Sequence, residues 1–125
     1  MKLYIGGFAQ GKLNYATAKN NINKVDIVDA EYSDFNELIN ARCIYRLHEW
    51  IKNVLDESMV NELADRLISE NPNAVIICDE VGYGVVPIDK NERVYRELVG
   101  RCLIKLANSS DEVERVVCGI GIKIK

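Results

Sequence analysis

Residues 2–13 read Lys-Leu-Tyr-Ile-Gly-Gly-Phe-Ala-Gln-Gly-Lys-Leu, a short apolar run that ends in two glycines and is followed by a Gly-Lys pair. The run Lys2–Ile5 is typical of a β-strand, and the residues after Lys12 are typical of a helix. Between them, Gly6 to Lys12 has the spacing G-x-x-x-x-G-K of a phosphate-binding loop. Such a loop wraps backbone N–H groups around phosphate oxygens, while the helix N-terminus and the lysine add positive charge. This stretch therefore predicts a nucleotide-binding strand, loop and helix.

The loop departs from the usual pattern at one position. Where a Ser or Thr normally supplies a hydroxyl to Mg²⁺, this chain has Leu13, which offers no oxygen. A plain glycine turn followed by a solvated lysine is the alternative interpretation. We expect the loop to bind phosphates and the missing hydroxyl to weaken Mg²⁺-dependent catalysis. The residues expected to bind the nucleotide are Gly6, Gly7, Phe8, Ala9, Gln10, Gly11, Lys12 and Leu13.

The composition limits the class of protein. The chain has 125 residues, 48% hydrophobic and 28% charged, which suits one globular nucleotide-binding domain over residues 1–125. A net charge of −3 provides no basic field, so we expect no nucleic-acid partner. The apolar runs are too short for a membrane span, and the N-terminus lacks the apolar region of a secretion signal. Four cysteines without a Cys-x-x-Cys pair favour free thiols in the cytoplasm over a zinc site or disulfides.

Strands and helices alternate along the rest of the chain. The uninterrupted apolar run Ala74–Cys78 is typical of a central parallel strand that is covered on both faces. Further strands are expected at 24–29, 115–118 and 120–124, helices at 12–20, 35–41 with a continuation through 53, 59–68 and 90–107, and a glycine-rich loop at 81–87. The alternation favours an α/β fold with a mainly parallel central sheet.

Candidate catalytic and metal-binding side chains lie at the ends of the predicted strands. Ligands of open α/β sheets bind at the carboxyl ends of the strands, where Asp79 and Glu80 follow one strand and Asp29 ends another. Carboxylates in such places hold Mg²⁺ or its water, or orient a nucleophile. We rank Glu80 above Asp79 and Asp29, with a helix cap or a solvated turn as the alternative for each. His48, the only imidazole, is interpreted as a packing or surface residue rather than a nucleophile.

Several stretches in order resemble the motifs of one known family. Residues 79–87, Asp-Glu-Val-Gly-Tyr-Gly-Val-Val-Pro, resemble its Asn-Glu-Val-Gly-x-Gly-Ile-Val-Pro motif, and residues 93–101 resemble the Arg-x-Phe-Arg-Asp-x-x-Gly-Arg run that follows. Residues 116–123, Val-Val-Cys-Gly-Ile-Gly-Ile-Lys, resemble its C-terminal strand, and the opening glycines through Lys12 resemble its phosphate loop. The family is the bifunctional adenosylcobinamide kinase/adenosylcobinamide-phosphate guanylyltransferase of cobalamin biosynthesis.

The resemblance implies a P-loop, RecA-like fold of three layers and a pair of activities. Members of the family phosphorylate the aminopropanol hydroxyl of adenosylcobinamide with ATP or GTP. They then transfer GMP from GTP onto that phosphate through a guanylylated histidine, and they are trimers. In this chain, Lys12 would neutralise the γ-phosphate, and Glu80 or Asp29 would hold Mg²⁺ through water or orient the substrate hydroxyl. A nucleotide and cobinamide are the implied partners.

Three departures from the family pattern bear on activity. The middle of the chain is shorter and lacks the His-rich stretch that carries GMP, and the residues after His48 are similar to a segment that lies downstream of that stretch. Leu13 replaces the metal-binding hydroxyl, and Leu103-Ile104 replaces an Asn-Gln pair. These differences argue against guanylyl transfer. They leave two hypotheses: a cobinamide kinase, or a catalytically impaired nucleotide- or corrinoid-binding pseudoenzyme or assembly partner.

Overall fold

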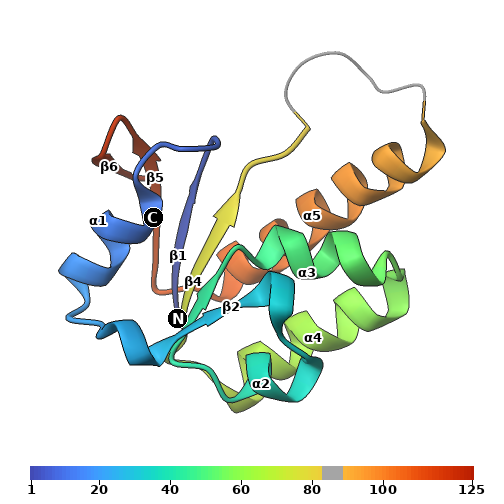
Figure 1. Cartoon of the computed structure of the whole chain (residues 1–125), viewed down its shortest axis with the longest axis horizontal. Coiled ribbons are helices and arrows are strands. Elements are labelled where there is room, and N and C mark those ends of the chain that lie inside the picture. Colours follow the sequence, from blue (N-terminus) through green and yellow to red (C-terminus); the bar gives the residue numbers. More distant parts are fainter. Residues whose placement is uncertain (83–88) are drawn as a thin grey trace.

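A six-stranded sheet forms the centre of the fold (Figure 1). The structure, a computed structural model, describes residues 1–82 and 89–125. The strands are β1 (Lys2–Gly6), β2 (Ile27–Asp29), β3 (Cys43–Tyr45), β4 (Val75–Asp79), β5 (Glu112–Val117) and β6 (Ile120–Lys123). Their order is β2-β3-β4-β1-β5-β6, with only the β5–β6 pair antiparallel among the described strands. This arrangement confirms the predicted α/β fold with a mainly parallel sheet.

Helices cover both faces of the sheet, which gives three layers (Figure 1). They are α1 (Lys12–Lys19), α2 (Phe35–Ile39), α3 (Leu47–Val54), α4 (Glu57–Glu70) and α5 (Lys90–Ser109), with short 3-10 turns η1 (Lys24–Asp26) and η2 (Ala30–Tyr32). Side chains alternate along β1, so that Tyr4 packs with Ala16 of α1 while Leu3 packs with the core formed by α2 to α5. None of the described helices is long and apolar enough to cross a bilayer.

Local sequence determines where several helices begin. The Asp34 side chain accepts a hydrogen bond from the Glu37 N–H, and the Glu37 side chain accepts one from the Asp34 N–H, which together form a capping box at the start of α2. Asp56 accepts from the Met59 N–H at the start of α4. These caps satisfy N–H groups that have no partner within their own helix.

The middle of the chain differs from the sequence prediction. The helix expected from Phe35 through Asn53 is interrupted by the strand β3, so that prediction is wrong between α2 and α3. Ile44 lies within the range predicted as helix, but it is a buried strand residue whose backbone pairs with Val28 of β2 and Ile76 of β4. A strand of three residues is too short to show the alternation that distinguishes it from part of a helix.

One predicted strand is shorter in the structure, and one predicted loop is not tested. The strand predicted at 24–29 is extended only over Ile27–Asp29, because Lys24–Asp26 forms the turn η1. The predicted glycine-rich loop at 81–87 lies outside the described residues from position 83 onward.

The carboxyl ends of β1, β3 and β4 meet at one edge of the sheet, since these strands are parallel and adjacent. That edge carries the candidate site.

Candidate functional site

The predicted phosphate loop connects β1 to α1, and its two spaced glycines occupy positions that other residues fit poorly. A Cβ on Gly6 would lie 2.5 Å from the carbonyl oxygen of Val116, so only glycine lets the chain pass β5 so closely. Gly11 is the N-cap of α1 and has a φ of 85°, in the left-handed region that favours glycine. The path of the backbone therefore gives a physical reason for the G-x-x-x-x-G spacing.

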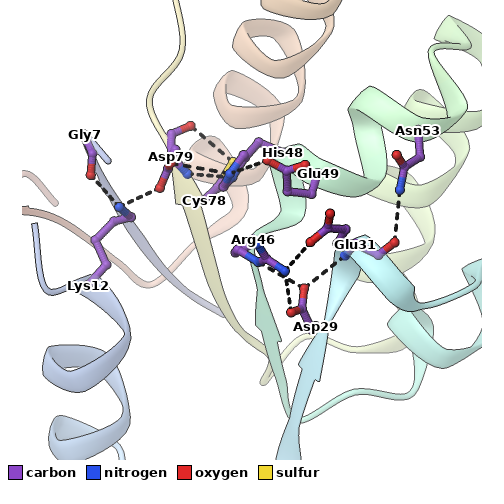
Figure 2. A network of polar contacts seen from close by, with 10 residues as sticks. All are labelled: Gly7, Lys12, Asp29, Glu31, Arg46, His48, Glu49, Asn53, Cys78 and Asp79. Carbon is purple, nitrogen blue, oxygen red and sulfur yellow. Dashed lines mark hydrogen bonds and ion pairs between the residues drawn. The ribbon is translucent and has the colours of Figure 1, made fainter. Parts of the chain in front are cut away.

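The Lys12 side chain is buried beside the loop, with 6% of its surface exposed. Its ammonium donates a hydrogen bond to the carbonyl oxygen of Gly7 at 2.6 Å and pairs with Asp79 Oδ1, also at 2.6 Å (Figure 2). Lys12 begins α1 and Asp79 ends β4, so the contact joins the start of the helix to the end of the strand that pairs with β1 through Gly6 and Asp79. An anion in the loop would compete with these two acceptors for the ammonium.

His48 lies on the other side of Asp79 and is held in one tautomer. Its Nδ1 accepts a hydrogen bond from the Asp79 backbone N–H at 3.0 Å. The proton of the neutral ring is therefore on Nε2, which faces Asp79 Oδ2 at 3.4 Å and Glu49 Oε1 at 3.5 Å (Figure 2). Burial lowers the pKa of His48, and it outweighs the opposite effect of the Asp79 and Glu49 carboxylates. The prediction of a packing residue agrees with this burial, but the ring also contacts the candidate site.

Arg46 is the residue between β3 and α3, with a φ of 58°. Its guanidinium binds both oxygens of Asp29, with Nη2 at 2.6 Å from Oδ2 and Nε at 3.2 Å from Oδ1, and it also contacts Glu31 (Figure 2). These hydrogen bonds raise the pKa of Arg46 above its ordinary value. The Asp29 carboxylate, expected from the sequence to face Mg²⁺, is thus engaged by an arginine.

Glu80, the other carboxylate favoured by the sequence, lies on a different side of its strand end from Asp79. Its Oε1 is 3.0 Å from Nε of Arg115, and its backbone N–H donates to the Gly6 carbonyl. Successive side chains of an extended chain point to opposite faces, so Asp79 and Glu80 cannot both meet Lys12. The structure brings Asp79 to Lys12, whereas Asp29 and Glu80 pair with arginines; their roles in metal binding and catalysis stay predictions.

A pocket of about 380 Å³ lies at this edge of the sheet. Six of the eight predicted loop residues line it, and the remaining lining comes mainly from the segment after β3. The lining residues are Phe8, Ala9, Gln10, Gly11, Lys12, Leu13, Asn14, Tyr45, Arg46, His48, Glu49 and Asp79. The sequence interpretation missed Tyr45, Arg46 and Glu49 because it placed them inside a helix; a strand assigned at Cys43–Tyr45 would have placed them at a carboxyl end.

The negatively charged oxygen ligands available to a metal in this pocket are carboxylates. Leu13, the second residue of α1, packs against the core and supplies no oxygen at the position of the usual hydroxyl. Asp79 and Glu49 are the carboxylates among the lining residues. In the part of the chain that the structure describes, no three His, Cys, Asp or Glu side chains form a cluster that could hold a metal ion. A metal bound to these two carboxylates would take its other ligands from water or from a bound anion.

Comparisons with known proteins agree with the resemblance found in the sequence. The family model described as cobinamide kinase / cobinamide phosphate guanyltransferase matches residues 9–124. A stretch of 51 residues is 47% identical to the bifunctional adenosylcobalamin biosynthesis protein CobU of Salmonella typhimurium and 45% identical to the protein of the same name from Escherichia coli. Each match covers 41% of this chain but only 28% of the relative. The chain belongs to the cobinamide kinase / cobinamide phosphate guanyltransferase family of cobalamin biosynthesis.

Proposed function

We propose that residues 1–125 form a single nucleotide-binding domain that transfers the γ-phosphoryl group of ATP or GTP to the hydroxyl of cobinamide. The buried Lys12, held at the end of a glycine loop and on the wall of a pocket, is the observation that carries this proposal. Phosphoryl transfer requires mainly correct positioning and neutralisation of charge on the phosphate oxygens. A cation fixed at the start of a helix meets both requirements.

Binding of a triphosphate would exchange the partners of Lys12. The ammonium would leave Asp79 for the β- and γ-phosphates, because a phosphate carries more charge than one carboxylate. Asp79 would then be available to hold Mg²⁺ or its water, with Glu49 as the neighbouring carboxylate. The bound metal would neutralise charge that develops on the β- and γ-oxygens. Asp29 and Glu80 remain candidates for the same role only if they leave their arginines.

We do not extend the proposal to guanylyl transfer. A histidine that attacks the α-phosphate must present an unprotonated nitrogen to it. The Nδ1 lone pair of His48 is used by the Asp79 N–H, and Nε2 therefore carries the proton. The ring is also buried. This arrangement supports the sequence argument that His48 is not the residue that carries GMP.

A second function, a nucleotide- or corrinoid-binding pseudoenzyme or assembly partner, is favoured by two observations. Leu13 removes the hydroxyl that normally binds Mg²⁺ directly, which weakens metal-assisted catalysis more than it weakens phosphate binding. The middle of the chain is also shorter than in the family and lacks the His-rich stretch that carries GMP. This alternative predicts nucleotide binding without phosphorylation of cobinamide.

The test combines binding with turnover. ATP and GTP binding is measured by calorimetry with Mg²⁺ and with EDTA, and phosphorylation of cobinamide is followed with γ-labelled nucleotide. Lys12→Ala is compared with Lys105→Ala, a matched control whose lysine pairs with Asp65 between α4 and α5. Loss of a hydrogen bond to a charged group predicts binding on the order of 10- to 100-fold weaker in Lys12→Ala and unchanged in the control.

Each outcome selects one function. Binding and turnover that both depend on Lys12 support the kinase. Binding that depends on Lys12 without turnover supports the pseudoenzyme. Equal nucleotide affinity in the wild-type protein and Lys12→Ala contradicts a working phosphate loop.

A further inference from the structure

The phosphate loop is hydrogen-bonded to the turn between β5 and β6, on the side of the loop that faces away from the pocket. Cys118 and Gly119 form this turn with φ values of 51° and 75°, the positive values that a two-residue type I′ hairpin turn requires. The Cys118 N–H donates to Gln10 Oε1 at 2.8 Å, and the Gly119 N–H donates to the Gln10 backbone carbonyl, also at 2.8 Å. One residue of the loop thus accepts from both residues of the turn.

The bond to the Gln10 carbonyl sets the direction of the next amide. The peptide unit that joins Gln10 to Gly11 is trans and planar, so its C=O and N–H groups point in opposite directions. Because the carbonyl points to Gly119, the Gly11 N–H is directed away from the turn. The pocket is lined by Gln10 and Gly11 but not by the turn, so the loop lies between the two. The Gly11 N–H is therefore directed as an anion-binding loop requires.

Close packing adds to these two hydrogen bonds. A Cβ on Gly11 would lie 3.3 Å from the Cα of Gly119, and a Cβ on Gly6 would lie 2.5 Å from the Val116 carbonyl oxygen. The backbone of the loop therefore rests against the end of β5 and the turn at both of its spaced glycines. Packing against the β5–β6 hairpin therefore constrains the backbone conformation of the loop.

We propose that the β5–β6 turn is part of the nucleotide site and that Gln10 is a positioning residue, which holds the loop in its anion-binding conformation through the turn. This inference rests on the proposed nucleotide binding. Without the Oε1 bond, the free loop would populate other conformations, and the apparent Kd would rise in inverse proportion to the competent fraction. One neutral hydrogen bond corresponds to a rise of about 2- to 12-fold.

Three variants test the proposal in the full chain. Gln10→Met keeps the length of the side chain but removes the oxygen acceptor, whereas Gln10→Glu keeps an acceptor. Asn40→Ala is the matched control, since it also removes a side-chain amide that is hydrogen-bonded to the backbone, in this case by donating to Asn36 O at 2.9 Å, at the end of α2. GTP and ATP affinities are measured by calorimetry, and exchange of the Cys118 amide proton is measured by NMR in the free protein.

We expect Gln10→Met to bind its preferred nucleotide about 2- to 12-fold more weakly and to exchange the Cys118 amide faster, while Asn40→Ala matches the wild-type protein in both. Gln10→Glu should restore slow exchange; because its charge repels phosphates, its affinity is not compared. Wild-type affinity in Gln10→Met, or unchanged Cys118 exchange, would overturn the positioning role and leave the proposed function intact. A wild-type protein that binds neither nucleotide would overturn the proposed function, and the positioning role with it.

Discussion

Asp79→Asn is the substitution that tests the Lys12 contact most directly. Asp79 Oδ1 lies 2.6 Å from Nζ of Lys12, and the two side chains are 17% and 6% exposed. At an effective dielectric constant of 20, two unit charges at this separation attract by about 6 kcal/mol before the cost of desolvation is subtracted. Removing one partner of a buried pair destabilises a protein by about 3–5 kcal/mol. Because Lys12 keeps its bond to Gly7 and Asp79 is partly exposed, we expect a loss of about 3 kcal/mol.

Urea unfolding at pH 7 measures this loss as a change in the midpoint with an unchanged slope. Glu80→Gln, one residue away, is the matched control. Glu80 is only 10% exposed, but its partner Arg115 is 45% exposed and stays solvated when the pair is broken, so we expect Glu80→Gln to lose about 1 kcal/mol. An Asp79→Asn protein that is no less stable than Glu80→Gln would refute the conclusion that the Lys12–Asp79 ion pair stabilises the fold.

Three further substitutions probe the loop, the histidine and the glycines. Leu13→Ser supplies the missing hydroxyl and should make nucleotide affinity, measured by calorimetry with and without EDTA, more dependent on Mg²⁺. Burial lowers the pKa of His48, so the neutral ring contributes its full stabilisation above about pH 6.5 and loses it as the pH falls through the folded-state pKa. In metal-free urea unfolding from pH 7 to 5, the free energy of unfolding should therefore decline in the wild-type protein more than in His48→Gln. Gly6→Ala should destabilise the protein by about 1–3 kcal/mol through the contact with Val116, whereas Gly100→Ala, in open space within α5, should stabilise it by about 0.5–1 kcal/mol in thermal unfolding.

A specific outcome would contradict each of these three predictions. Unchanged Mg²⁺ dependence in Leu13→Ser would mean that the metal is held elsewhere or that the loop does not bind nucleotide. The same decline with pH in His48→Gln would assign the proton uptake to other groups. A Gly6→Ala protein as stable as Gly100→Ala would show that the end of β5 moves aside at little cost.

The loop and the central strand were predictable because their signals are local. Gly11 needs its left-handed backbone wherever such a loop caps a helix, and the apolar run that became β4 is buried on both faces of the sheet. By contrast, Cys43–Tyr45 has only three residues, and their spacing also fits a helix. The pairing with β2 and β4 supplies the information that this short stretch lacks.

The sequence alone did not show which carboxylate faces Lys12. Asp79 and Glu80 are adjacent and chemically alike, and both follow the same strand. Only the register that pairs Gly6 with Asp79 shows which of the two side chains faces Lys12. The ion pair between Asp29 and Arg46 could not be predicted from the sequence either, because these residues are separated by 17 positions.

By itself, the sequence determined the α/β class, the glycine loop after the first strand and the family, because glycine spacing, continuous apolar runs and ordered motifs are encoded over a few residues. Only the tertiary structure decided that Asp79 contacts Lys12, that Nδ1 of His48 accepts a hydrogen bond from a backbone N–H, and that Gln10 is hydrogen-bonded to the β5–β6 turn. These contacts depend on strand register and on residues up to 108 positions apart, which no local pattern specifies.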